Sequence, residues 1–334
     1  MIVHRLGELE MELSNAYSFY DTFMDILTQR LSDDIGPLLK GCDVIAEDAL
    51  RRGMIADFTV PPLVYCDRGF GAATLREGVS IVKGMPNPIP FIAIPYSRIE
   101  EKYNLISINH EAGHQALVKL NLVETLSALF REVLKNAGAS SLVQEFYANW
   151  SRELGPDFWA FCLSGMAQTC SLRDILILPT EYMFQVSPSQ VHPPAYLRFL
   201  VSVEWCRQCW GTGDWDGWEE EWRELYPTDE LDEATAECIK EAEKFIPVIA
   251  RACINTRFKK LNRKPLTSLF DFSQLEPSLL KKHASEEGIQ PESFRKLSIG
   301  SQLAVFRLMR ESGNCKQTAI DQHMSKWLTD IQKT

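Results

Sequence analysis

The chain has 334 residues, of which 45% are hydrophobic and 10% aromatic, so it can bury a large core and is long enough for two domains. A formal net charge of −10 argues against nucleic acid or an anionic membrane as the main partner. The nine cysteines are odd in number and scattered, which predicts reduced thiols and a cytoplasmic location rather than a disulfide framework.

The first thirty residues mix acidic and apolar residues at helical spacing, so we expect no secretory signal there. No apolar run approaches the roughly 18 residues that a membrane span requires. Residues 1–55 are therefore predicted to form a helical N-terminal segment.

Between residues 56 and 96 the pattern changes to short extended runs, "FTVPPLVYC", "GVSIVKG" and "IPFIAIP". Glycine, proline and asparagine separate them, which is typical of the strands and turns of a small sheet. From residue 105 the pattern is helical almost to the end of the chain. A small sheet followed by helices predicts an α+β fold that is mostly helical.

The first of these helices, predicted over residues 105–120, contains His110 and His114 in "HEAGH". At 3.6 residues per turn the two imidazoles lie on one face and can bind one cation together. Glu111 directly follows His110 in the sequence. From this position a carboxylate can reach a water on the metal without being a ligand itself, as in the HExxH motif of hydrolases. Gly113, inside the helix, costs roughly 1 kcal/mol relative to Ala, and close packing of another element against the histidine face would explain it.

A catalytic zinc site commonly has three protein ligands, so a third ligand is expected on a following helix. After a helix over residues 122–136, another is predicted to begin at Ser140 or Ser141 and to run toward residue 165.

That helix carries "NWSRELGPDFWAFCLSG", in which Glu153 and Asp157 are one turn apart and can point the same way. We expect Glu153 to bind the metal and Asp157 to orient a ligand histidine. The same spacing also permits Asp157 as the ligand, and Glu145, two turns before Glu153, is a further alternative.

"HEAGH" followed by "WSRELGPDFWAFCLSG" resembles the gluzincin class of zinc metallopeptidases, whose second motif is a Glu with an Asp four residues later. The resemblance implies zinc as the cofactor, with His110, His114 and Glu153 as ligands. It further implies Glu111 as general base and Asp157 as the orienting residue. The implied fold is zincin-like: a small antiparallel sheet packed on the active-site helix, with added helical segments.

A third patch, "SQVHPPAYLRFLV" at residues 189–201, is similar to a His-Pro and Arg element that several gluzincin groups carry. His192 is expected to donate a hydrogen bond to a tetrahedral oxyanion, with Tyr196 as an alternative donor and Arg198 fixing their position. Alternatively, the two prolines simply start a helix that His192 caps. The resemblance covers roughly residues 85–205.

The charge along the chain is uneven. Residues 204–248 hold fourteen acidic against four basic residues, whereas residues 255–334 hold fourteen basic against eight acidic residues. We therefore predict four regions: the N-terminal helical segment (1–55), a zincin-like metal-binding catalytic core (56–205), an acidic Trp-rich helical region (206–250) and a basic helical C-terminal region (251–334). The basic region is expected to offer a surface to a protein partner.

Together these patterns predict a cytoplasmic zinc-dependent hydrolase, a peptidase acting on peptide or protein substrates, with no nucleic-acid or membrane partner. The strand at residues 90–95 is expected to pair with an extended peptide by β-addition. One alternative is a catalytically silent gluzincin-fold scaffold or binding protein. Another is a hydrolase of non-peptide amides that uses the same ligands.

Overall fold

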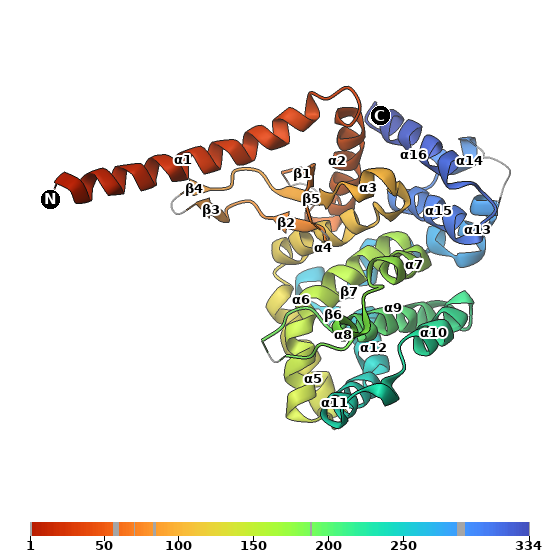
Figure 1. Ribbon diagram of the computed structural model, residues 1–334. Coiled ribbons are helices and arrows are strands. Elements are labelled where there is room, and N and C mark those ends of the chain that lie inside the picture. The colour runs from red at the N-terminus through yellow and green to blue at the C-terminus, as the bar shows by residue number, and fades with distance from the viewer. Residues whose placement is uncertain are drawn as a thin grey trace.

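The computed structural model of the chain describes residues 2–55, 60–69, 71–82, 85–187, 189–285 and 291–333. Residues 58–59 and 83–84, which belong to two of the predicted extended runs, lie outside the described residues, as does the predicted boundary at residue 56. The described chain is mostly helical with a small sheet (Figure 1), which confirms the predicted α+β class.

The strands are β1 (Leu63–Asp67), β2 (Ala73–Leu75), β3 (Ser80–Val82), β4 (Met85–Pro86), β5 (Phe91–Pro95), β6 (Arg257–Phe258) and β7 (Lys264–Pro265). The helices of the first half are α1 (Ile2–Arg30), α2 (Gly36–Leu50), α3 (Ser97–Glu100), α4 (Ser107–Lys119), α5 (Val123–Asn136), α6 (Ser141–Ser164) and α7 (Met166–Ile175). Those of the second half are α8 (Thr180–Met183), α9 (Ala195–Trp210), α10 (Asp214–Leu225), α11 (Glu233–Lys244), α12 (Ile246–Asn255), α13 (Pro277–Ser285), α14 (Pro291–Arg295), α15 (Ile299–Ser312) and α16 (Gln317–Ile331).

The three-stranded sheet has the order β1-β5-β2, with β1 parallel and β2 antiparallel to β5. The expectation of an antiparallel sheet is therefore wrong, and the sheet is mixed. The chain passes through β2 and the β3–β4 pair before it returns as β5, and a connection of this length allows β5 to run in the same direction as β1.

The central position of β5 also overturns the expectation that residues 90–95 pair with a peptide. β5 is buried and is hydrogen-bonded to a strand on each side. The outer edge of β1 is covered by side chains: Gln29 bonds the backbone N–H and C=O of Cys66, while Asp43 and Arg30 bond those of Val64. β2 is consequently the edge strand whose backbone remains for pairing.

Helices α4 and α5 both pack against α6, and the predicted helices at 105–120 and 122–136 are confirmed. Ser140 caps α6, because its side chain accepts a hydrogen bond from the Val143 N–H. A Cβ atom on Gly113 would lie 2.9 Å from the backbone Cα of Pro156 in α6. The prediction that another element packs closely against the histidine face of α4 is thus confirmed.

The C-terminal helices pack on the rest of the molecule, with α16 against α2 and α15 against α7. Gly300 shows how close this packing is, since a Cβ there would collide with the backbone carbonyl of Leu163 at the end of α6. The buried apolar residues form one continuous cluster from Leu39 to Leu328. The division into four regions stays a prediction, but all four regions share this core.

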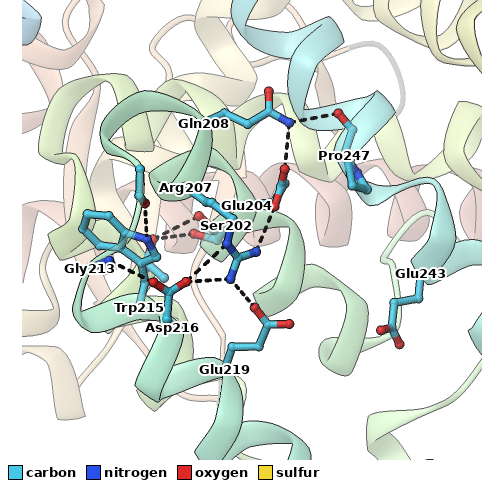
Figure 2. A network of polar contacts seen from close by, with 12 residues as sticks. Ser202, Glu204, Arg207, Gln208, Gly213, Trp215, Asp216, Glu219, Glu243 and Pro247 are labelled. Atoms are coloured by element: carbon cyan, nitrogen blue, oxygen red, sulfur yellow. Dashed lines mark hydrogen bonds and ion pairs between the residues drawn. The ribbon is translucent and has the colours of Figure 1, made fainter.

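The acidic Trp-rich segment forms α10 and α11, and its acids have a structural use. Figure 2 shows Arg207 of α9 bonded to Glu204, Asp216 and Glu219. The nitrogen-to-oxygen distances of these ion pairs are 2.9, 2.8 and 2.6 Å, respectively. Trp215, Trp218 and Trp222 are buried on the same side of α10. This network fixes α10 on α9, the helix that carries Arg198.

Helix α1 extends away from the body of the molecule toward the N-terminus (Figure 1), and much of its surface is exposed. Among the described helices, none combines the length and the apolar character needed to cross a membrane. All nine cysteines are free thiols.

Replacing Gly113 by Ala should lower the free energy of unfolding by roughly 1–3 kcal/mol, because the added methyl group meets the Pro156 backbone and the helices cannot separate without cost. Gly217 in α10 is the matched control, since it is exposed and a Cβ there meets no atom within 4 Å. Gly217→Ala should raise stability by about 0.5–1 kcal/mol. Urea unfolding of both variants measures the difference, and equal effects would contradict the close packing of α4 on α6.

Candidate metal centre

Three potential metal ligands converge where α4 crosses α6. His110 and His114 share one face of α4, and their Nε2 atoms are 3.1 Å apart. Glu153 of α6 places Oε2 3.4 Å from His110 Nε2 and Oε1 3.7 Å from His114 Nε2. One donor atom from each of the three residues lies within 4.8 Å of the others.

These separations are short enough for one ion to contact all three residues. Two ligands that each lie roughly 2.0–2.1 Å from a tetrahedral zinc are about 3.3–3.4 Å apart, and the two imidazole nitrogens, at 3.1 Å, are close to this separation. The two histidines approach different oxygens of Glu153, at 3.4 and 3.7 Å. The set of two imidazole nitrogens and one carboxylate also suits zinc chemically. The three residues could therefore hold a metal ion.

Asp157 lies one turn after Glu153 and fixes the first histidine. Its Oδ1 is 2.8 Å from Nδ1 of His110, so the opposite ring nitrogen, Nε2, is directed at Glu153 and His114. Arg198 of α9 donates two hydrogen bonds to the same carboxylate, at 2.6 and 2.9 Å. A carboxylate held in this way from two sides cannot rotate without losing charge-assisted bonds.

The ionisation of these groups follows from their mutual contacts. Burial alone lowers the pKa of His110, but the Asp157 charge, with hydrogen bonds to Asp157 and Glu153, outweighs it and raises the pKa to about 10. Burial raises the pKa of Glu153, but the hydrogen bond from His110 and the charge of Arg198 outweigh it and hold the pKa at about 2. Both carboxylates of α6 are therefore ionised at neutral pH.

The other two residues of the motif are shifted mainly by burial. Desolvation, with a smaller contribution from the charge of His110, lowers the pKa of His114 to about 3, so its imidazole is neutral. Desolvation raises the pKa of Glu111 to about 7, although His110 acts in the opposite direction. At neutral pH the carboxylates of Glu153 and Asp157 thus face two cations, the His110 imidazolium and the Arg198 guanidinium. A metal ion bound at Nε2 of His110 would take the place of the proton there.

A cavity of about 840 Å³ opens onto this cluster. Its lining includes Glu111 and also His192, whose side chain is 60% exposed and whose Nε2 lies 3.5 Å from Glu153 Oε1. Arg198 lines it as well, with a guanidinium nitrogen 3.6 Å from Glu153 Oε2. The structure thus brings together seven of the eight predicted site residues.

Tyr196 is the exception, and its expected place at the site is wrong. It is buried on the far side of α9, where Arg223 donates a hydrogen bond to its hydroxyl and Phe184 packs against its ring. Two residues along a helix correspond to a rotation of about 200°, so Tyr196 points away when Arg198 points in. Glu145, the alternative ligand, forms an exposed ion pair with Arg131.

The predicted extended runs do not include β2, the strand that borders the site. β2 has only three residues, yet Ala73 and Thr74 line the cavity beside α4. The amide of Gln115, one residue after His114, donates a 2.9 Å hydrogen bond to the Thr74 hydroxyl. This bond connects the edge strand β2 to α4. A polar residue on a buried helical face was the one signal that pointed to this contact.

Comparison with known protein families, with curated proteins and with solved structures finds no match to this chain.

We expect the purified protein to hold about one zinc per chain, because the two imidazoles and Glu153 complete an N,N,O ligand set. His114→Ala removes one ligand and should reduce zinc to near background in elemental analysis. Equal zinc content in both proteins would argue against this centre.

Substitutions in α6 separate the ligand from the orienting residue. Glu153→Ala should nearly abolish zinc binding, whereas Asp157→Asn should weaken it by roughly 10- to 100-fold, since it loosens only the support of His110. Glu145→Ala, at an exposed site on the same helix, is the control and should leave zinc affinity unchanged. Competition with a chromogenic chelator gives the affinities, and a larger effect for Asp157→Asn than for Glu153→Ala would reverse the two roles.

Proposed function

We propose that the chain is a zinc-dependent hydrolase that cleaves peptide bonds, with a zincin-like arrangement of the gluzincin type. The observation that carries the proposal is the position of Glu111, buried beside the three converging ligands and lining the same cavity. A purely structural metal site has no use for a further buried carboxylate with a pKa near neutrality.

Zinc held by His110, His114 and Glu153 would supply Lewis-acid chemistry, lowering the pKa of a water to about 7 and polarising a carbonyl group. Glu111 accepts the proton of the attacking water and passes it to the leaving amine. Burial opposes the ionisation of Glu111 and so favours its taking up a proton, as a general base must.

The remaining residues have supporting roles. His192, at the exposed side of the cluster, donates a hydrogen bond to the oxygen that becomes negative when the carbonyl is attacked. Arg198 is a positioning residue, since its guanidinium is engaged by Asp157 and approaches Glu153.

The position of β2 favours a peptide over other amides. An edge strand that lines the cavity next to α4 offers backbone groups to an extended chain, and main-chain pairing of this kind provides affinity without sequence specificity. The predicted partner is accordingly a peptide or an extended protein segment.

Glu111→Gln tests the assignment as an enzyme. It keeps the three ligands but removes the proton acceptor, so zinc content should stay the same and the rate of peptide-library hydrolysis, followed by mass spectrometry, should fall at least roughly 100-fold. Glu124→Gln, an exposed carboxylate on the same cavity wall, serves as the control and should keep full activity. Binding of peptides without hydrolysis by the wild-type protein would instead support a silent binding protein.

A further inference from the structure

The cavity continues past the metal centre to a second polar wall that the proposed chemistry does not use. This wall consists of Arg98 in α3, Ser107 at the start of α4 and Gln168 in α7. Arg98 and Gln168 are only 8% and 3% exposed, although both line the cavity. A buried guanidinium on a cavity wall is costly unless a negative group binds to it.

Each of the three residues has an unused polar atom. Arg98 Nε, Ser107 Oγ and Gln168 Oε1 are buried and have no hydrogen-bond partner among the described residues. Buried polar atoms in proteins are nearly always paired. The N–H group of Arg98 and the hydroxyl of Ser107 can donate to an acceptor on a ligand, whereas Gln168 Oε1 is itself an acceptor and would pair with an N–H group of the ligand.

The charge of Arg98 is also incompletely balanced. The Glu101 carboxylate is 3.7 Å away and 44% exposed, which makes it a weak counter-ion. Asp174 contributes a further favourable charge but is itself bound to Arg307 at 2.7 Å. In agreement with this, burial outweighs the nearby Glu101, Tyr103 and Asp174 and lowers the pKa of Arg98.

We propose that Arg98, Ser107 and Gln168 form a subsite for a carboxylate group of the substrate. An arginine fork binds a carboxylate through two parallel hydrogen bonds, and the hydroxyl and amide groups add further donors. The neighbouring face of α7 presents Leu172 and Ile175 to the same cavity, an apolar wall suited to the methylene groups of an acidic residue.

The subsite lies close to the reacting centre. Ser107 precedes Glu111 by four residues on α4, so the two share a face and are separated by about 6 Å along the helix axis. An extended peptide advances roughly 3.3–3.6 Å per residue. The recognised carboxylate thus belongs to a residue within about two positions of the cleaved bond, either as an Asp or Glu side chain or as the C-terminal carboxylate.

Peptide binding tests the subsite without relying on hydrolysis. The probes are acetylated pentapeptides in three versions: Gln-containing with an amidated C-terminus, Glu-containing with an amidated C-terminus, and Gln-containing with a free C-terminus. Titration calorimetry on the zinc-loaded Glu111→Gln variant should show roughly 10- to 100-fold tighter binding of one acidic version than of the neutral peptide. Which acidic version binds more tightly identifies the source of the carboxylate, and equal binding of all three would overturn the proposal.

Substitutions then assign the preference to particular residues. In the Glu111→Gln background, Arg98→Gln should reduce the preference for the acidic peptide over the neutral one to within about twofold. Zinc content and the thermal unfolding midpoint show whether this variant is folded. Arg152→Gln is the matched control, because Arg152 lines the same cavity but is exposed and forms only a weak ion pair with Glu124. An unchanged preference in Arg98→Gln would overturn the proposal.

If Arg98→Gln does not fold, Gln168→Leu decides the question. It replaces the amide by an apolar side chain of similar volume and should reduce the preference by roughly 3- to 10-fold. A preference that survives this substitution unchanged would count against the subsite.

The subsite rests on the proposed function in one respect only: the position of the carboxylate relative to a cleaved bond is defined only if the protein is a hydrolase. Acid-selective binding that depends on Arg98, together with an absence of hydrolysis by the wild-type protein, would support the subsite and remove the enzyme assignment. Hydrolysis with no preference for acidic peptides would do the reverse.

Discussion

The site depends on the contact between α4 and α6 at Gly113. Glu153 approaches both histidines because the backbone of Pro156 lies directly against α4, at a distance that no side chain larger than hydrogen permits. Gly155 repeats this on a neighbouring face, where a Cβ would meet Leu117 and Leu126 of α4 and α5. Two glycines that weaken their helices locally thus allow three metal-ligand candidates to converge.

A second requirement is charge balance in a buried place. Asp157 is completely buried, which is tolerable because His110 and Arg198 approach it from opposite sides. Arg198 belongs to α9, and α9 is fixed by the network of Arg207 with the acids of α10 (Figure 2). The acidic segment after residue 205 therefore supports the candidate metal centre indirectly, through the helix that supplies this guanidinium.

The cavity has different chemistry on its different sides. The metal-ligand candidates, Glu111 and His192 line one part of it, the edge strand β2 offers backbone groups, and Arg98 offers a buried positive charge. This arrangement explains why polar residues such as Gln115 and Gln168 occupy buried positions on their helices. In an ordinary helical core, apolar residues would stabilise those positions better.

Features that depend on helical spacing could be predicted from the amino-acid sequence alone. Four-residue separations place His110 with His114, and Glu153 with Asp157, on common faces of α4 and α6, and Ser140 marks a helix start because its hydroxyl satisfies a free N–H group. These are local properties, fixed within one or two turns of backbone.

Contacts between distant segments could not be predicted in this way. Three features join segments that are distant in sequence: the parallel pairing of β1 with β5, the role of β2 as the edge strand, and the presence of Arg98 and Gln168 in one cavity lining. Tyr196 shows the same limit, since the spacing places it opposite Arg198 on α9, but only the packing of α9 decides which of the two faces the site. Local periodicity defines the faces of an element, whereas the partner of each face is chosen by packing over the whole chain.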